Sequence, residues 1–266
     1  MSPIHDQSYR RYAGTKRPLG QSWQVIAGTG IRSMLSRKWF LALLLMAWVP
    51  FIVRTVQIYV VTMYPTAGQL APVDPKMFMQ FVEQQGTFVF FVTVFVGSGL
   101  IAADRRANAL QVYLSKPLLR IEYIAGKLAI LATFLAFVTI VPALLLIIMQ
   151  VSFSGSVEFL KSNLFLIPAV VLASLARVIV SSFAMLYAGT IFFTEAIFGV
   201  LSGITASTRS AWISLSANLE NITDVMFRQT PRYETPAIVS VLVLIGLVVL
   251  SISVLERRVR GVEVVA

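Results

Sequence analysis

The stretch GSGLIAADRRANALQVYLSKPLLRIEYIAGK, residues 97–127, is a charged segment set between two long apolar runs. Further apolar runs follow along the chain, each near the length of about 20 residues that a helix needs to cross a bilayer. The 266 residues are 57% hydrophobic and only 13% charged, with a mean hydropathy of +0.80. A soluble domain needs a more polar surface, and the short alternating segments of a membrane β-barrel are absent. The sequence therefore predicts an all-α polytopic membrane protein.

The apolar runs predict six transmembrane helices. Their expected ranges are 39–63, 81–103, 128–151, 163–180, 187–206 and 236–255. Pro50 lies inside the first range and is expected to kink it, because proline removes a backbone donor. Pro142 lies inside the third range. The region 163–206 is too long for one crossing at a rise of about 1.5 Å per residue. We therefore place a tight, uncharged turn at 181–185 between the fourth and fifth spans.

The segments outside these spans have their own patterns. Residues 1–38 are expected to form a tail and an amphipathic interfacial helix at 20–38, and residues 39–266 the transmembrane domain. The alternative for 20–38 is a plain extension of the first span. Residues 64–80 are expected to be an external loop. Within 207–235, apolar residues recur at steps of three and four, which predicts a short helix on the outer membrane surface.

The distribution of charge predicts the orientation. The whole net charge of +10 falls on the side that holds both termini and the segment 104–127, and the opposite loops are neutral. Because cytoplasmic loops carry an excess of Lys and Arg, both termini and this segment are expected in the cytoplasm. The basic balance is thus a topology signal, and nucleic acid is not an expected partner. With no signal peptide at the N-terminus, the first span is expected to act as the targeting signal.

The sequence lacks the residues that several kinds of catalytic and metal-binding sites need. There is no cysteine, and His5 is the single histidine, so neither a metal site nor thiolate chemistry is expected. The acids are scattered singly, so no catalytic residue is assigned. No Gly-x-x-x-x-Gly-Lys-Ser/Thr motif occurs, so this chain is not expected to bind or hydrolyse ATP.

The charged segment itself predicts an exposed helix. Asp104 is suited to its N-terminus and Pro117 to its end. Leu110, Tyr113 and Leu114 share one face of this helix, and basic side chains flank them. Two interpretations stay open: the helix inserts into a groove of a partner protein, or it lies on anionic lipid headgroups.

Several motifs in and beside this segment resemble those of a known family. They are Gly-x-Gly-Leu-Ile-x-x-Asp-Arg-Arg at 97–106, Leu-Ser-Lys-Pro-Leu-x-Arg at 114–120, Tyr123, and Gly126-Lys127. Together they resemble the loop after the second span in type-2 ABC exporter permeases, where a cytoplasmic coupling helix docks on a separate ATPase subunit. The uncharged turn at 181–185 departs from the family, whose members often have basic residues there.

The resemblance implies partners and site residues. It implies two copies of an ABC ATPase subunit, which bind ATP and Mg, and a second permease copy in a homodimer or heterodimer. It also implies the bacterial cytoplasmic membrane as the location. The coupling residues that it implies lie in or next to the loop 104–127: Asp104, Arg105, Arg106, Leu110, Tyr113, Leu114, Lys116, Pro117 and Arg120.

Four charged residues fall inside the predicted spans. Such residues normally face a partner or a polar cavity, because charge is costly in lipid. Arg54 and Glu83 lie toward the outer side of neighbouring spans, and Arg177 and Glu195 lie in the fourth and fifth. We expect each couple to pair, with one pair lining the substrate route. The alternative is a purely structural pairing, or snorkelling toward the interface.

The function expected from the sequence is the permease subunit of an ATP-driven exporter. An ATP-independent channel or carrier is the main alternative. A membrane-embedded lipid-modifying enzyme is a third class, disfavoured because its acids would be clustered. The sequence does not identify the transported substrate.

Overall fold

The computed structural model describes residues 22–69, 71–97, 120–183 and 187–258. Every regular element within these ranges is a helix, as the sequence predicts. The elements are α1 (Ser22–Leu35), α2 (Lys38–Ala47), α3 (Val49–Met63), the 3-10 helix η1 (Pro65–Gln69), α4 (Pro75–Val92), the π-helix η2 (Thr93–Gly97), α8 (Arg120–Ser154), α9 (Glu158–Ser162), α10 (Leu166–Phe183), α11 (Tyr187–Thr205), the 3-10 helix η3 (Arg209–Ile213), α12 (Leu215–Met226) and α13 (Ala237–Arg258).

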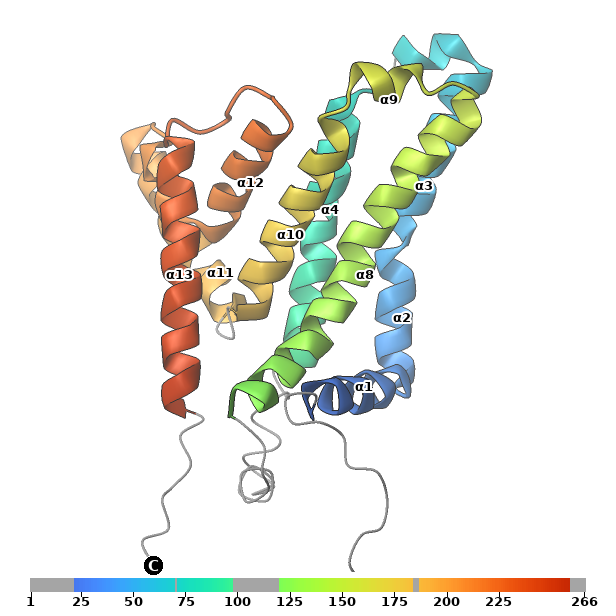
Figure 1. The fold of residues 1–266 in the computed structure, drawn as a ribbon. Helices are drawn as coiled ribbons and strands as arrows, with labels where there is room; N and C mark the ends of the chain where they lie inside the picture. Colours follow the sequence, from blue (N-terminus) through green and yellow to red (C-terminus); the bar gives the residue numbers. More distant parts are fainter. Residues whose placement is uncertain (1–21, 70, 98–119, 184–186, 259–266) are drawn as a thin grey trace, which may run out of the picture.

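The helices form an elongated bundle with two distinct ends (Figure 1). At the lower end, α1 lies across the starts of α2 and α8, and α13 finishes beside them. At the upper end, η1 lies at the top of α3, and α9 lies between the tops of α8 and α10. We call these the α1 end and the α9 end. The long helix α8 packs against α1, α3, α4 and α10 and so holds these helices together.

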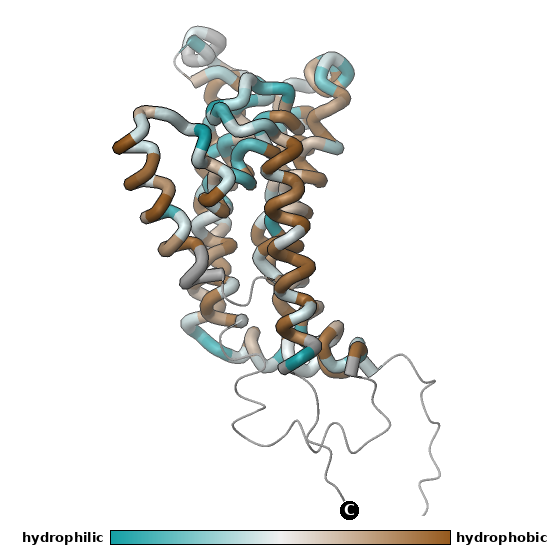
Figure 2. Tube along the Cα trace, turned by 90° about the vertical axis from the view of Figure 1, so that its left-hand side faces the viewer, coloured by the Kyte–Doolittle hydropathy of each residue, from teal (hydrophilic) through white to brown (hydrophobic). Residues whose placement is uncertain are grey.

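Four of the described helical stretches are long and apolar enough to cross a membrane. They are Lys38–Met63, Ile121–Ser154, Leu166–Phe183 and Ala237–Leu255. Figure 2 shows their hydrophobic residues along the length of the bundle, with hydrophilic residues gathered at its ends. The other two predicted spans differ. The apolar part of α11, Ile191–Thr205, is short, and α4 carries several polar residues. Their passage through a membrane stays a prediction.

Several helices extend beyond the ranges predicted for the spans. The second helix begins at Pro75 instead of residue 81, because Asp74 caps it: its Oδ1 accepts a hydrogen bond of 2.9 Å from the Met77 N–H. Aspartate at an N-cap followed by proline is a standard start signal for a helix. The third helix begins at Arg120 instead of residue 128. The fourth continues to Phe183, through the first part of the predicted turn.

The prolines act differently in the two helices that contain them. The first span is interrupted at Trp48, between α2 and α3, and Pro50 lies in the first turn of α3. This break confirms the predicted kink, since proline cannot donate the hydrogen bond that would continue α2 into α3. By contrast, Pro142 lies inside α8, which remains one helix over its 35 residues.

The helix predicted at 20–38 is present as α1. Its position in a bilayer stays a prediction, but its contacts with the protein are described. Ala27 is buried, and Ile31 and Met34 pack on the core beside α8. Two glycines make this crossing close. A Cβ on Gly126 would lie 2.9 Å from the Trp23 carbonyl oxygen, and one on Gly30 would overlap Ile130.

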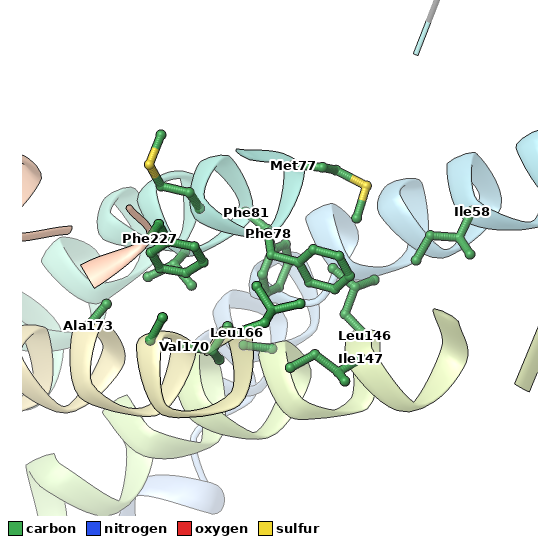
Figure 3. Close-up of a cluster of buried hydrophobic side chains, with 14 residues drawn as sticks. Ile58, Met77, Phe78, Phe81, Leu146, Ile147, Leu166, Val170, Ala173 and Phe227 are labelled. Carbon is green, nitrogen blue, oxygen red and sulfur yellow. The ribbon is translucent and has the colours of Figure 1, made fainter. Parts of the chain in front are cut away.

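A buried apolar cluster fixes α4, α8 and α10 to one another in the half near the α9 end. Figure 3 shows Phe78 and Phe81 of α4 between residues of α8 and α10. Both rings are almost completely buried, as are Leu146 and Leu166. Between membrane helices such contacts stabilise by close packing, because lipid is as apolar as the side chains. With this face of α4 packed, the remaining faces of the helix meet α12 and the polar residues described below.

The helix predicted in 207–235 is present as α12, but its predicted place is wrong. It starts within the bundle beside the middle of α11 and runs toward the α9 end, packed among α10, α11 and α13 instead of lying over them (Figure 1). Leu215, Leu219 and Ile222 face a cluster that includes Val180 and Leu244. The side chains of Asn218, Asn221, Thr223 and Asp224 on α12 are also buried. The polar face of α12 therefore points into the protein.

Candidate functional site

Arg54 and Glu83 are not paired with each other. The guanidinium of Arg54 donates to Gln57 on its own helix at 2.9 Å and to the Oε1 atoms of Gln80 and Gln84 on α4 at 3.4 Å. Neutral amides thus satisfy this cation. Because Glu83 is paired elsewhere, the predicted Arg54–Glu83 pair is wrong.

Glu83 instead belongs to a cluster centred on Arg232, in the segment between α12 and α13. Nη2 of Arg232 lies 2.6 Å from Glu83 and 2.7 Å from Asp224, and Nη1 lies 3.5 Å from Glu220. The Asp224 side chain is 1% exposed, so its carboxylate depends on Arg232 for a charged partner. We call these four residues the Arg232 cluster. It ties α4 to α12 with a single guanidinium among three carboxylates.

The surroundings of Arg232 and of its neighbour Tyr233 fix the protonation of these two residues. The bond to Asp224, ahead of that to Glu83, raises the pKa of Arg232 above its already high ordinary value. Tyr233 donates a 2.6 Å hydrogen bond to Glu220. Burial, and then this bond, raises the pKa of Tyr233 above its ordinary range. Arg232 therefore stays charged and Tyr233 stays protonated near neutral pH.

Arg177 extends from α10 into the protein. Arg177 is 6% exposed, and its Nη2 donates to Thr223 Oγ1 of α12 at 3.3 Å. It also interacts electrostatically with Glu83. Gly86 of α4 makes room for it, because a Cβ there would lie 3.2 Å from Arg177 Nη1. Arg177 thus lies between α4 and α12.

Glu195 has a different role from the predicted pairing with Arg177. Its Oε1 accepts hydrogen bonds from Ser214 Oγ at 2.6 Å and from the Ser216 N–H at 3.2 Å. Ser214 is the N-cap of α12 and accepts from the Ala217 N–H. A carboxylate is stabilised beside the free N–H groups and positive dipole of a helix N-terminus. Glu195 therefore fastens α11 to the start of α12, and the predicted Arg177–Glu195 pair is wrong.

Two cavities of about 340 Å³ each meet at Glu83. The first, the Arg232 cavity, lies toward the α9 end and is lined by Lys76, Gln80, Asp224 and Arg232 among others. The second, the Arg177 cavity, has both polar and aromatic walls. Its lining includes Glu83, Gly86, Thr87, Phe90, Phe91, Arg177, Phe192, Ser216 and Glu220. Glu83 and its partner Arg232 stand at the boundary between the two.

A third and much smaller cavity lies toward the α1 end. It has a volume of about 20 Å³ and is lined by Thr93 and Gly97 of η2, Lys127, Leu128 and Leu131 of α8, and Ser181 and Ser182 of α10. We call it the hydroxyl cavity. No residue lines both this cavity and the Arg177 cavity.

The three cavities follow one face of α4 and η2. Their lining residues there include Lys76, Gln80, Glu83, Thr87, Phe90, Thr93 and Gly97. We call this set the α4 stripe. Its spacings of three and four place it on one side of a helix. From Lys76 to Gly97 the stripe is about 31 Å long at 1.5 Å per residue, close to the hydrocarbon thickness of roughly 30 Å.

The predicted coupling residues Asp104, Arg105, Arg106, Leu110, Tyr113, Leu114, Lys116 and Pro117 lie outside the described residues, and so does the side chain of Arg120. Their roles stay predictions. Among the described residues, no group of three His, Cys, Asp or Glu side chains is arranged to hold a metal ion.

Comparisons with protein-family models, curated proteins and solved structures give no match for this chain. Any functional conclusion therefore depends on the residues and cavities themselves.

Sequence reasoning missed Arg232, Gly86 and the hydroxyl cavity. Arg232 and Asp224 were available as charges in the polar segment 207–235, but their spacing of eight residues gives no signal of a turn that brings them together. Gly86 interrupts an otherwise bulky helix, which is a weak sign of close approach by a neighbour. Ser181 and Ser182 fall in the predicted turn 181–185, whereas the structure has them in the last turn of α10.

Proposed function

We propose that this chain is the membrane-spanning permease subunit of an ATP-driven exporter in the bacterial cytoplasmic membrane. The observation that carries the proposal is the α4 stripe. Three cavities lie in succession along one helix face whose length matches the thickness of a bilayer. Ionisable side chains inside a membrane are costly and rare, and they commonly mark the pathway of a substrate or an ion.

The proposal places α4 and α11 among six crossing helices. α4 is polar because one of its faces lines the route instead of facing lipid. The apolar faces of α3 and α13, with exposed residues such as Ile52 and Leu242, then contact the bilayer. In this arrangement the α1 end is cytoplasmic. The cations Arg32, Arg37, Lys38 and Lys127 near that end support this orientation.

ATP enters the proposal through a separate subunit. The motifs at 97–106 and 114–120 resemble those of a coupling loop, and residues 98–119 connect η2 to α8 in the chain. Movement of that segment by two ATPase subunits would pull on the α1 end of the α4 stripe. A second permease copy completes the transporter.

The Arg177 cavity indicates the kind of cargo. Its volume of about 340 Å³ is within the range of small-molecule sites, which run from roughly 300 to 1,000 Å³. One wall carries charged groups, among them Glu83 and Arg177, and another carries phenylalanine rings, among them Phe90 and Phe192. Such a lining suits an amphipathic solute with a polar and an apolar part.

Copurification tests the proposed function. The tagged full chain is purified from its native membrane, and the bound ATPase subunit is detected by its ATP hydrolysis. Tyr113→Ala or Leu114→Ala is expected to reduce the retained ATPase at least several-fold. Tyr64→Ala, an exposed tyrosine near the α9 end, is the matched control and should leave it unchanged. Transport by the reconstituted chain with no ATPase would instead identify an ATP-independent carrier or channel.

A further inference from the structure

The hydroxyl cavity has the size of a single small molecule. It lies where η2, α8 and α10 meet at the α1 end, and its volume is about 20 Å³. A polar cavity of roughly 10–15 Å³, measured in this way, is enough for one water molecule. The cavity is therefore large enough for one water and too small for the amphipathic solute that fits the Arg177 cavity.

Three hydroxyl groups line this cavity without a hydrogen-bond partner. Thr93, Ser181 and Ser182 are 5%, 0% and 4% exposed, and none of their side-chain oxygens has a protein partner. Some buried hydroxyls elsewhere bond within their own helix, as Thr139 does to the Leu135 carbonyl at 2.8 Å, whereas Ser174 Oγ of α10 also has no partner but lines none of the three cavities. A buried hydroxyl without any partner costs free energy, so three around one small space call for a polar occupant.

The helix geometry contributes to the cavity. Thr93–Gly97 is a π-helix at the end of α4, where each turn holds more residues than in an α-helix. π-turns of this kind are rare and occur frequently at functional sites. Here the π-turn provides Thr93 and Gly97 to the cavity wall, opposite the last turn of α10.

We propose that the hydroxyl cavity binds one water molecule, which bridges η2 and α10 and closes the α4 stripe at the α1 end. A buried water needs two to four polar partners, and three hydroxyls that rotate to donate or accept supply them. A metal cation is disfavoured because Lys127 lines the same wall. The role as a closure rests on the proposed transport function, whereas the binding of water does not.

The cavities along the α4 stripe differ in volume between its two ends. Toward the α9 end the Arg232 and Arg177 cavities are each about 340 Å³. Toward the α1 end the stripe borders the hydroxyl cavity, which is about 20 Å³. In the proposed route, passage of a solute past this point separates Thr93 from Ser181 and Ser182 and releases the water.

A double-mutant cycle tests for the shared water. Thr93→Val and Ser182→Ala are made singly and together in the full chain, and the midpoint of thermal unfolding, Tm, is measured in nanodiscs. No hydrogen bond joins the two hydroxyls, since neither has a protein partner. With a bridging water, each single change lowers Tm by about 2–4 °C. The double variant then loses little more than one single variant, because the first change already releases the water.

The control replaces a hydroxyl that has its own partner. Thr139→Val removes the bond to the Leu135 carbonyl, away from the cavity lining. Its Tm shift should simply add to that of Ser182→Ala. An empty cavity predicts the opposite for the test pair: each change raises Tm by removing an unpartnered buried hydroxyl, and the shifts add. That result overturns the proposal.

A second measurement covers variants that do not fold. An experimental structure of the unmodified chain, at a resolution that shows ordered waters, should contain one peak within hydrogen-bond distance of Thr93, Ser181 and Ser182. Replacing sodium chloride by sodium gluconate should leave Tm unchanged. No peak, or a Tm that depends on chloride, contradicts a bound water. Neither measurement involves ATPase or transport, so each can fail while the proposed function stands.

Discussion

Glu83 of α4 and Arg232, 149 residues further along the chain, are joined by an ion pair of 2.6 Å. The pair stands where two cavities meet. It links α4, which carries the α4 stripe, to the segment that holds α12 and α13 in place. This single contact therefore connects the candidate route to the part of the bundle that surrounds it.

Removal of Arg232 should destabilise the protein. Arg232→Ala leaves the Asp224 carboxylate, 1% exposed, without its cation. The expected loss is about 2–3 kcal/mol, below the value for a fully buried pair because the Arg232 side chain is 36% exposed. Thermal or denaturant unfolding in detergent measures it. Arg209→Ala is the control, since Arg209 pairs with Glu234 at an 87% exposed position and should cost at most about 0.5 kcal/mol.

The contact of α1 with α8 should depend on Gly126. In Gly126→Ala the new Cβ meets the Trp23 carbonyl oxygen at 2.9 Å and Ile26 Cβ at 2.8 Å, so α1 must shift. A loss of about 1–3 kcal/mol is expected, as for other overpacked sites. Gly28→Ala on α1 meets no atom within 4 Å and should be neutral or slightly stabilising. Equal effects of the two substitutions on the unfolding midpoint would argue against this packing.

Charge exchange between Arg177 and Glu195 should fail to restore the protein. Arg177→Glu removes the donor to Thr223, and Glu195→Arg removes the acceptor for Ser214 and the Ser216 N–H. Because the two residues have separate partners, the double variant should be at least as unstable as the worse single one. Recovery of folded yield in the double variant, measured by size-exclusion chromatography, would show that they do pair.

Cysteine labelling should reveal the α4 stripe. The chain has no cysteine, so a thiol reagent labels it only at an introduced cysteine. Gln80→Cys and Thr87→Cys line the two large cavities and should react with a membrane-impermeant thiol reagent added on the external side. Thr93→Cys, in the closed hydroxyl cavity, should not react. Val82→Cys, 1% exposed in the packed core, is the unreactive control on the same helix.

The sequence predicted the helical class and the positions of most long helices, because apolar runs of membrane length leave few other structures. It also predicted the break near Pro50 and the helix α12, since proline and helical periodicity act locally.

The sequence did not predict which charged residues pair with each other. The partners of Glu83 and Glu195 are set by the path of the chain from α12 to α13 and by the N-terminus of α12, which no local pattern encodes. The place of α12 was wrong for a related reason. Its apolar residues pack on helices, but their spacing is the same as for a helix packed on lipid.

The most direct test of the account is labelling of Thr87→Cys and Thr93→Cys while the complete transporter hydrolyses ATP. The chain is reconstituted with its ATPase subunits, and labelling by the external thiol reagent is compared with and without ATP, so no knowledge of the cargo is needed. A permease whose route follows the α4 stripe predicts that ATP changes the labelling rate at both positions several-fold and leaves Val82→Cys unreactive. Rates at Thr87→Cys and Thr93→Cys that stay the same during ATP hydrolysis would contradict it.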